Sequence, residues 1–496
     1  MNLREILEIS ASELPRKAAL IHNLRRVTYQ ELDQTANRVA NALIGLGLTK
    51  GDHVAILMSH SPDWVISYFG VIKAGGVVVL LSTMLKAPEI THLLRDSDTK
   101  ILITEKSYSR MLKSVLADCP LLEQVLEVDG DWYQSLLASS SAVAPSVKIN
   151  DQDRATIIYT SGVLGRQKGV VHTHASFMGT PEIVSKGIGR TREDVVIDTV
   201  PFFYLFGLSE VLFGSMIKGA SVVIVSQFTP RAVLEVVERE RGTILFGVPA
   251  IHNTLAMSRQ DVISKYDTSS LKVASTAGAK TSPHLMRMLE EKLGVTLCET
   301  YGLSELSVVS MSTIENQRLG TVGRPICELR IVDDNGKDVA IGEIGEAVFK
   351  VPWMMKEYYK APELMAEVVK GGWFYTGDSV RMDGDGYLEY VEKKSFIIVT
   401  PSGLKISPWE VEDLLLQHPA LAEVAYVGVG DTHHKLIPTA FVVLKPGHSV
   451  TEKDLTAFCR QNLADFKLPK KFEFVESIPK TGSGKTNRHQ LKQWPE

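Results

Sequence analysis

The sequence predicts an α/β protein with a large N-terminal domain and a small, mobile α+β domain at its C-terminal end. Stretches with helical and strand-like spacing of apolar residues alternate between 27 and 105 and again between 195 and 301. Such alternation is typical of parallel-type sheets with helices on both faces, so each block is expected to form one αβ-layered subdomain. Between 320 and 390 short strands alternate with Gly and Asp turns, which indicates a small β-barrel.

The apolar pattern divides each block into elements. In the first block it predicts helices at 31–46 and 63–74, strands at 53–57, 77–81 and 100–104, and then a linker at 139–153. The second block is expected to hold strands at 220–225, 243–248 and 273–276 and a helix at 283–293. A compact βαβ-like tail follows, with helices at 411–417 and 455–463 and strands at 424–429 and 440–444. We therefore expect domains at 1–394 and 395–496.

Composition restricts the classes of function. The 496 residues carry a formal net charge of −4 and a pI of about 6.4, which gives no reason to expect nucleic acid as a partner. The longest apolar runs are no longer than a strand, so no transmembrane segment is expected, and acidic residues near the N-terminus argue against a signal peptide. The four cysteines lack CxxC spacing and are expected to be buried thiols of a reducing compartment. These features favour a cytoplasmic protein.

A glycine-rich loop follows the strand-like run at 155–160. Its sequence is Ser161-Gly162-Val163-Leu164-Gly165-Arg166-Gln167-Lys168-Gly169, and a second strand-like run at 170–174 comes next. Glycines, hydroxyls and a lysine on a strand-to-strand turn suit a clamp on a polyphosphate, because backbone N–H groups form an anion nest and Lys168 adds a charge. Taken alone, such a hairpin is equally typical of an ordinary turn.

A second glycine-rich segment, Pro479-Lys480-Thr481-Gly482-Ser483-Gly484-Lys485, lies near the C-terminus. Together with Thr486 it reproduces the last three residues of a Walker A loop. However, Pro479 stands where that motif needs a glycine, and too few residues follow for the required βα unit. We therefore expect Lys485 to reach a phosphate that another part of the chain holds.

Several short motifs occur in a fixed order along the chain. They are Tyr159-Thr160-Ser161-Gly162 with Lys168-Gly169, Pro201 to Gly207, Thr276-Ala277-Gly278-Ala279, Glu299 to Glu305, Gly320 to Pro325, Trp373 to Asp378, Lys393, Gly403 to Pro408 and Lys485. Each motif alone is weak, whereas the ordered set is specific. Over nearly its whole length the chain resembles the adenylate-forming superfamily. This superfamily comprises acyl-CoA synthetases, luciferases and the adenylation domains of peptide synthetases.

The resemblance implies a two-step reaction that uses ATP, Mg²⁺ and coenzyme A. A carboxylate is a poor electrophile, so it is first joined to AMP with release of pyrophosphate, and a thiol then attacks the acyl carbon. The resemblance implies ATP or AMP contacts at Thr160, Ser161, Gly162, Gly165, Lys168, Gly278, Ala279, Glu299, Thr300, Tyr301, Gly302, Asp378 and Lys393. Mg²⁺ would be held by Glu305 and Thr160.

Individual roles are implied in the same way. Tyr301 would lie against the adenine, Ser304 would contact the α-phosphate, and Asp378 would accept hydrogen bonds from the ribose hydroxyls. Lys485 would bridge the carboxylate and the α-phosphate, which makes Lys485, Glu305 and Ser304 the expected catalytic residues. The C-terminal domain would pivot near Ser395, bringing Lys485 in for adenylation and then presenting the Gly403 face to the thiol.

The sequence departs from the superfamily pattern at a few positions. The two usual threonines of the phosphate loop are absent, and two lost hydroxyl donors to phosphate, at about 1–3 kcal/mol each, predict weaker ATP binding. Lysine also replaces the arginine that usually contacts the ribose, which keeps the charge but loses the planar fork. The changed positions are Val163, Leu164, Gln167, Tyr204, Lys393 and Ser395.

Apolar residues dominate the expected acyl pocket, and Phe202 to Leu205 lacks the aspartate that pairs with an amino acid's ammonium group. The expected lining residues are Phe203, Tyr204, Phe206, Leu208, Val248, Ile251, Ala277, Leu306, Val308 and Val309. We therefore expect an acid–CoA ligase for a medium- or long-chain fatty acid or an aryl acid.

Two alternatives remain open at this point. One is an acyl-AMP ligase that loads a carrier protein, and the other is a degenerate nucleotide- or acyl-binding homologue. A homodimer is also an open alternative. No metal site is expected at His172/His174 or His433/His434, since neither pair has Cys or carboxylate partners at ligand spacing.

Overall fold

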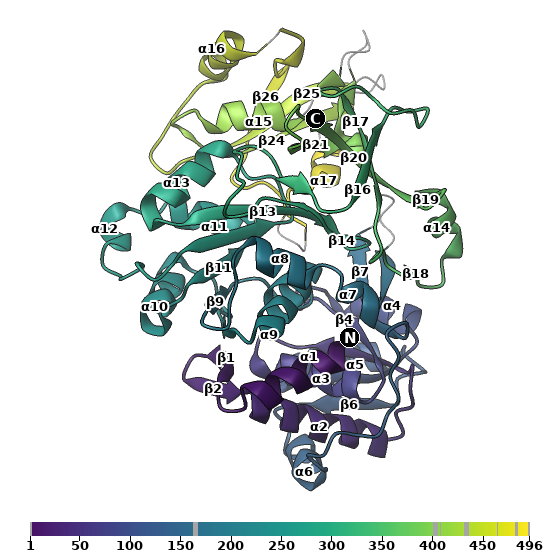
Figure 1. Cartoon of the computed structure of the whole chain (residues 1–496). Helices are drawn as coiled ribbons and strands as arrows, with labels where there is room; N and C mark the ends of the chain where they lie inside the picture. Colours follow the sequence, from purple (N-terminus) through teal and green to yellow (C-terminus); the bar gives the residue numbers. More distant parts are fainter. Residues whose placement is uncertain are drawn as a thin grey trace. The chain divides into compact units, whose positions relative to one another are not determined.

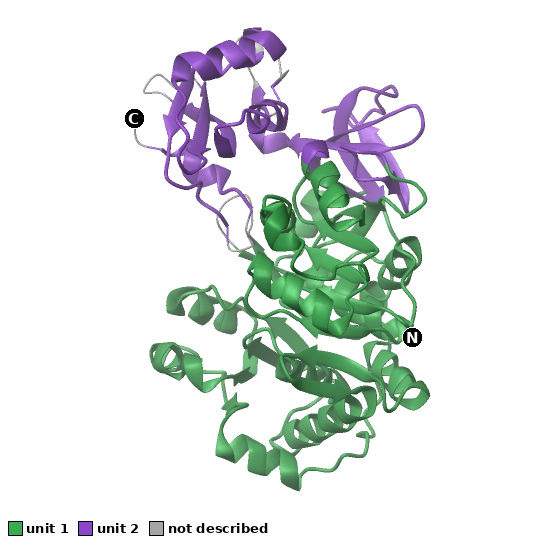
Figure 2. Ribbon diagram, turned by 90° about the vertical axis from the view of Figure 1, so that its left-hand side faces the viewer, with its two compact units in different colours: residues 1–281, 285–317, 350–372 green, residues 282–284, 318–349, 373–496 purple. Residues whose placement is uncertain are grey.

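The computed structural model describes residues 2–161, 167–399, 405–406, 408–430, 436–463, 465–481 and 485–494 (Figure 1). The predicted site residues Gly162 and Gly165, together with Gly403, His433 and His434, lie outside this part of the chain. The chain divides into two compact units (Figure 2). Unit 1 comprises 1–281, 285–317 and 350–372, and unit 2 comprises 282–284, 318–349 and 373–496. The domain boundary expected after residue 394 stays a prediction.

The first sheet of unit 1 has the strand order β18-β8-β7-β4-β3-β5-β6. Its central strands pair in parallel, and β8 and β18 extend one edge in antiparallel pairing. The strands are β3 (His53–Leu57), β4 (Val77–Leu80), β5 (Thr99–Thr104), β6 (Gln124–Glu127), β7 (Arg154–Ser161), β8 (Gln167–Thr173) and β18 (Glu357–Tyr358).

The second sheet of unit 1 has the order β14-β13-β12-β11-β9-β10-β1-β2. The strands from β13 to β1 pair in parallel, whereas β14 and β2 are antiparallel to their neighbours. The strands are β1 (Ala18–His22), β2 (Arg25–Thr28), β9 (Val195–Asp198), β10 (Ser221–Ile224), β11 (Ile244–Gly247), β12 (Val273–Ala277), β13 (Thr296–Leu303) and β14 (Ser307–Met311).

Helices between the strands cover the sheets of unit 1 (Figure 1). Local sequence sets their starts: α2 begins with a capping box in which the Thr28 hydroxyl accepts from the Glu31 N–H and the Glu31 carboxylate accepts from the Thr28 N–H. The helices are α1 (Leu3–Glu13), α2 (Tyr29–Gly45), α3 (Pro62–Lys73), α4 (Ala87–Asp96), α5 (Ser109–Leu116), α6 (Asp131–Ser139), α7 (His174–Phe177), α8 (Pro181–Gly187), α9 (Gly214–Lys218), α10 (Pro230–Glu240), α11 (Pro249–Ala256), α12 (Gln260–Ile263), α13 (Pro283–Leu293) and α14 (Pro362–Val368).

Unit 2 contains a small barrel-like sheet and an α+β tail. The strands of this sheet that belong to unit 2 are β16 (Glu328–Val332), β17 (Ile344–Lys350), β20 (Trp373–Met382) and β21 (Leu388–Lys393), and the short β19 (Val369–Lys370) also pairs with β20. In the tail, β24 and β25 pair antiparallel, and β25, α16 and β26 form a parallel crossover unit. The tail elements are the two-stranded pair β22 (Ile398–Val399) and β23 (Lys405–Ile406), followed by α15 (Pro408–Leu416), β24 (Leu421–Gly430), β25 (Leu436–Leu444), α16 (Glu452–Asn462), β26 (Lys471–Phe474) and α17 (Arg488–Lys492).

The predicted α/β class is confirmed, with two parallel-containing sheets, a barrel-like sheet and an α+β tail. The strand expected at 170–174 ends one residue early, because the Thr173 hydroxyl caps α7 by accepting from the Ser176 N–H. None of the four cysteines, all of which lie in the described ranges, forms a disulfide. A search of the described helices found none with the length and apolar content that a membrane crossing requires.

Candidate active site

The turn between β13 and β14 carries the residues expected to contact the α-phosphate and Mg²⁺. A register shift follows Tyr301, and a Cβ atom at Gly302 would lie 2.2 Å from the carbonyl oxygen of Ser307. Only glycine fits this close approach of two backbones. Ser307 itself has φ of +53°, a left-handed conformation that closes the turn. The turn therefore has a shape that its sequence strongly restricts, with Ser304 and Glu305 at its tip.

A buried histidine on β8 fixes the backbone of this turn. The carbonyl oxygen of Ser304 can only accept, so the Nε2–H of His172 donates to it, at 2.6 Å. The other ring nitrogen, Nδ1, lies 2.9 Å from the Ser176 hydroxyl and is left as an acceptor. Burial lowers the pKa of His172 to about 4, against the opposing effect of the Ser304 carbonyl, so the ring is neutral near pH 7.

The next two carbonyl groups of the turn are held by the segment before β18. The N–H of Met355 donates to the Glu305 carbonyl and the indole N–H of Trp353 donates to the Leu306 carbonyl, each at 2.8 Å. The Tyr358 hydroxyl donates to Oε1 of the Glu305 side chain, also at 2.8 Å. Burial raises the pKa of Tyr358 above its usual range, and the Glu305 charge adds to this effect, so the hydroxyl stays protonated. The half-buried Glu305 carboxylate therefore has a fixed donor at one oxygen.

The phosphate loop joins the same region through Lys168. Thr160 and Lys168 are directly opposite each other in the β7–β8 pair. The ammonium of Lys168 lies 5.1 Å from the ring centroid of Tyr358, a cation–π distance. Tyr358 thus contacts two residues expected to bind MgATP that stand far apart in the sequence.

The predicted adenine-side residues lie at the carboxyl ends of β12 and β13. Gly278 has φ of +89° and is exposed together with Ala279. The hydroxyl of Thr300 donates to the Thr276 carbonyl at 3.4 Å. Glu299 is only 2% exposed, and its carboxyl accepts from the backbone N–H of Thr281 at 3.1 Å.

The carboxyl of Glu299 has an unusual acidity for a glutamate. Burial raises its pKa to about 8, against the lowering effects of the Thr281 N–H and the Lys280 charge. The predicted nucleotide contact Glu299 is therefore a buried group that holds a proton near pH 7. The neighbouring residue Tyr301 is 8% exposed.

Several of the residues expected to line an acyl pocket lie in a π-helix, Phe206–Phe213, or just before it. Phe206 is half-buried, with its ring centroid 5.6 Å from that of Phe246, and Tyr204 lies 4.6 Å from Phe203. Burial raises the pKa of Tyr204 to about 12. The remaining residues of the predicted set differ in burial: Leu208, Leu306 and Val309 are fully buried, Phe203, Ala277 and Val308 are nearly so, and Val248 and Ile251 are half-buried.

Unit 2 carries the remaining predicted residues, Asp378, Lys393 and Lys485. Asp378 on β20 and Lys393 on β21 are register partners, and an ion pair of 2.7 Å joins them. Lys393 also donates to the Thr376 carbonyl at 3.3 Å. The carbonyl of Lys485 accepts from the Thr481 N–H at 2.7 Å, and the residue is exposed.

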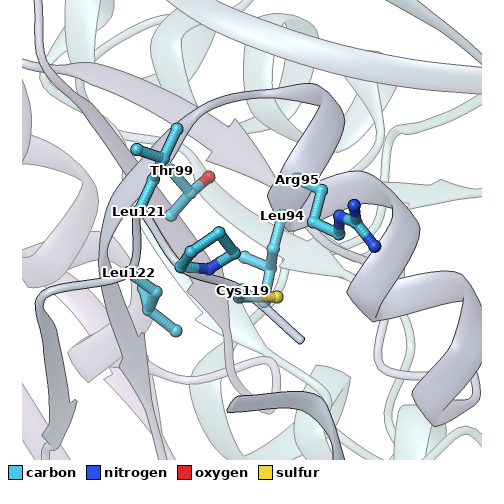
Figure 3. A pocket seen from close by; sticks show the side chains of 7 residues that line it. Leu94, Arg95, Thr99, Cys119, Leu121 and Leu122 are labelled. Atoms are coloured by element: carbon cyan, nitrogen blue, oxygen red, sulfur yellow. The ribbon is translucent and has the colours of Figure 1, made fainter. Parts of the chain in front are cut away.

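A cavity of unit 1 lies away from these residues. It is formed near the end of α4 and the segment before β6, and Figure 3 shows its lining residues Leu94, Arg95, Thr99, Cys119, Leu121 and Leu122. Among the predicted site residues that the structure describes, none lines it.

Three side chains that hold the turn or its carboxylate were not predicted from sequence to act there, those of His172, Trp353 and Tyr358. His172 was expected only not to bind metal. A signal for the other two would be the density of aromatic residues between 353 and 359, in a segment that no motif identified.

Comparison with known proteins gives consistent results over the whole chain. Residues 7–359 match the family model described as AMP-binding enzyme, and residues 410–485 match the one described as AMP-binding enzyme C-terminal domain. The chain is 31% identical to the long-chain-fatty-acid–CoA ligase of Bacillus subtilis (strain 168), over 99% of this chain and 94% of that protein. It is also 31% identical to the feruloyl-CoA synthase of an Amycolatopsis species, over 96% of each. A similar solved structure is that of the anthranilate CoA ligase AuaEII in complex with anthranoyl-AMP, with a TM-score of 0.93, 29% identity and coverage of 99% of this chain and 97% of that chain.

Proposed function

The chain belongs to the AMP-binding enzyme family and is an AMP-forming acid–thiol ligase, and we propose that it joins a fatty or aryl carboxylic acid to coenzyme A at the expense of ATP. The acid would first become an acyl-AMP, with pyrophosphate as the leaving group. The thiol of coenzyme A would then displace AMP from the acyl carbon. ATP, Mg²⁺ and coenzyme A are the cofactors and co-substrates of this reaction.

One observation carries the proposal. Lys168 of the phosphate loop and Glu305 of the β13–β14 turn both contact Tyr358, although they stand far apart in the sequence. An ammonium group and a carboxylate brought to one place suit a polyphosphate with its metal ion, since the first binds phosphate and the second binds a hard cation.

The residues present fit a magnesium ion. Mg²⁺ is usually held by one or two carboxylates together with substrate phosphates, and it takes oxygen ligands. The half-buried carboxylate of Glu305 and the half-buried hydroxyl of Thr160 supply such oxygens. When bound, Mg²⁺ would neutralise charge on the phosphates of ATP.

The other roles are proposed as follows. Ser304, whose carbonyl His172 holds, would direct its side chain to the α-phosphate, and Tyr301 would lie against the adenine. Asp378 would bind the ribose, with Lys393 as its ion-pair partner. Lys485 would stabilise the negative charge that develops as the carboxylate attacks phosphorus.

The acyl group is proposed to be uncharged. All the residues expected to line its pocket are apolar or aromatic, including the half-buried Tyr204, Phe206 and Val248. A charged tail would lose its hydration there without a partner. This supports fatty and aryl acids equally.

The test is ATP–pyrophosphate exchange with purified protein over a panel of fatty, aryl and amino acids. We expect exchange with at least one fatty or aryl acid, and AMP formation that depends on coenzyme A. Exchange without any use of coenzyme A would instead indicate an acyl-AMP ligase that serves a carrier protein. ATP binding without exchange for any acid would indicate a degenerate binding protein and would defeat the proposal.

A further inference from the structure

We propose that Tyr358 is a positioning residue of the ATP site, which holds the carboxylate of Glu305 and the ammonium of Lys168 in place for MgATP. The inference rests on the proposed function, because it assigns Glu305 to the metal ion and Lys168 to the phosphates. It adds a residue that contacts both groups at the same time.

The two contacts use different parts of one side chain. The hydroxyl donates to Oε1 of Glu305 at 2.8 Å, so the rotation of the carboxylate is restricted. The ring face receives the Lys168 ammonium, 5.1 Å from the centroid. Without Tyr358, the carboxylate of Glu305 and the ammonium of Lys168 would be able to form an ion pair with each other. Neither group would then be available to bind MgATP.

The backbone around Tyr358 is well anchored. Tyr358 is 3% exposed, and β18 pairs with β8 so that Tyr358 lies opposite Val170. The preceding residue, Glu357, forms an ion pair of 2.6 Å with Arg154. The tyrosine is therefore held on the strand next to the one that carries Lys168.

The next residue supplies a matched control. Tyr359 follows the last residue of β18, and its side chain has other partners. Its hydroxyl donates to Asp98 at 2.9 Å, and its ring lies against His53. Tyr359→Phe removes a hydroxyl of the same kind from the adjacent residue, where the hydrogen bond is to Asp98 instead of Glu305.

The experiment compares Tyr358→Phe, Tyr358→Leu and Tyr359→Phe with the wild type. MgATP affinity is measured by calorimetry without any acid, together with the Mg²⁺ concentration that gives half-maximal binding. We expect Tyr358→Phe, which keeps the ring, to weaken MgATP binding about tenfold and to raise the Mg²⁺ midpoint, as a lost hydrogen bond to a charged group requires. Tyr358→Leu, which also loses the ring face, should bind still more weakly, and Tyr359→Phe should match the wild type within about twofold.

A second readout separates positioning from damage to the fold. With a synthetic acyl-adenylate supplied, Tyr358→Phe should form the thioester at the wild-type rate, since the phosphates bound by Lys168 have already left. Unchanged MgATP affinity and Mg²⁺ midpoint in Tyr358→Phe would overturn the inference. An equal loss in the thioester step would also overturn it, because it would indicate a general structural role. If the wild type binds MgATP but shows no exchange with any acid, the proposed function fails while the binding comparison still decides the role of Tyr358.

Discussion

At the scale of single residues, the candidate site combines buried groups whose acidity the fold has shifted in opposite senses. Burial lowers the pKa of His172 to about 4 and raises that of Glu299 to about 8, so both are neutral near pH 7. A neutral imidazole can donate to the Ser304 carbonyl and accept from Ser176 at once. Neutrality therefore makes these side chains suitable as parts of the frame around the site.

The acidity of Glu299 makes stability depend on pH in a defined direction. The unfolded chain loses this proton near pH 4.5, whereas the folded protein keeps it up to about pH 8. Between these values the folded state binds more protons, so its stability falls as the pH rises. We expect Glu299→Gln, which cannot ionise, to become progressively more stable than the wild type from pH 5 to pH 8, as measured by urea unfolding.

An exposed glutamate provides the control for this prediction. Glu235, which pairs with Arg231 on the surface of α10, is replaced by glutamine in the same way. Its effect on the free energy of unfolding should vary little over that pH range. A constant difference between Glu299→Gln and the wild type at every pH would contradict the prediction.

Sequence motifs identified the residues that are expected to contact ligands. They did not identify the residues that hold those ligand-contacting side chains in place. Lys168 and Glu305 stand in motifs because the chemistry requires those residue types at those positions. Tyr358 could not be found in this way, since its role depends on the pairing of β18 with β8, across a long separation in the sequence. The residue-by-residue assignments to ATP, metal and acyl group stay predictions.

At the scale of elements, the β13–β14 hairpin brings Ser304 and Glu305 to its tip by a bulge that needs glycine. A Cβ at Gly302 would lie 2.2 Å from the Ser307 carbonyl oxygen. Because this is a backbone atom, relieving the clash requires a shift of the main chain, which costs free energy. We expect Gly302→Ala to lower the free energy of unfolding by about 1–3 kcal/mol and to slow adenylation. Denaturant unfolding and pyrophosphate exchange measure the two effects.

A glycine without close neighbours serves as the comparison. A Cβ at Gly45, in the last turn of α2, would have no atom within 4 Å. Gly45→Ala should leave stability unchanged or slightly higher, because alanine favours helix more than glycine does. Equal effects of the two substitutions would show that the bulge does not need glycine.

Apolar spacing predicted a part of the regular elements of the fold. The strand at 53–57 and the helix at 283–293 were predicted with the bounds of β3 and α13, and the other predicted elements differ by a few residues. The π-helix at Phe206–Phe213 was not predicted. Its apolar residues show no clear helical spacing and are equally typical of any buried segment. Short pieces such as β18 carry too few residues for any periodicity.

At the scale of the whole molecule, each of the two units carries residues that the proposed reaction needs. Lys485 belongs to unit 2, whereas Ser304 and Glu305 belong to unit 1. If the C-terminal segment moves between two steps, Lys485 is needed only in the first. We expect Lys485→Ala to slow adenylation by roughly 100- to 1,000-fold, the scale of a lost charge-stabilising group, and to leave thioester formation from supplied acyl-adenylate unchanged.

A neighbouring lysine tests whether this effect is specific. Lys480 lies in the same tail and forms a surface ion pair of 2.6 Å with Glu423. Lys480→Ala removes an equal charge and should change neither step by more than about twofold, since exposed ion pairs contribute little. Equal losses in both steps for Lys485→Ala would contradict its assignment to adenylation alone.

The central claim is that this chain activates a carboxylic acid as an acyl-AMP and transfers the acyl group to coenzyme A. The most direct measurement is a single-turnover reaction of the wild-type protein with MgATP and the acid that gives the fastest exchange, followed by mass spectrometry. The account predicts that acyl-AMP and pyrophosphate form in equal amounts, and that added coenzyme A converts the acyl-AMP to thioester and AMP. Hydrolysis of ATP without any acyl-AMP, or an acyl-AMP that coenzyme A leaves unchanged, would contradict it.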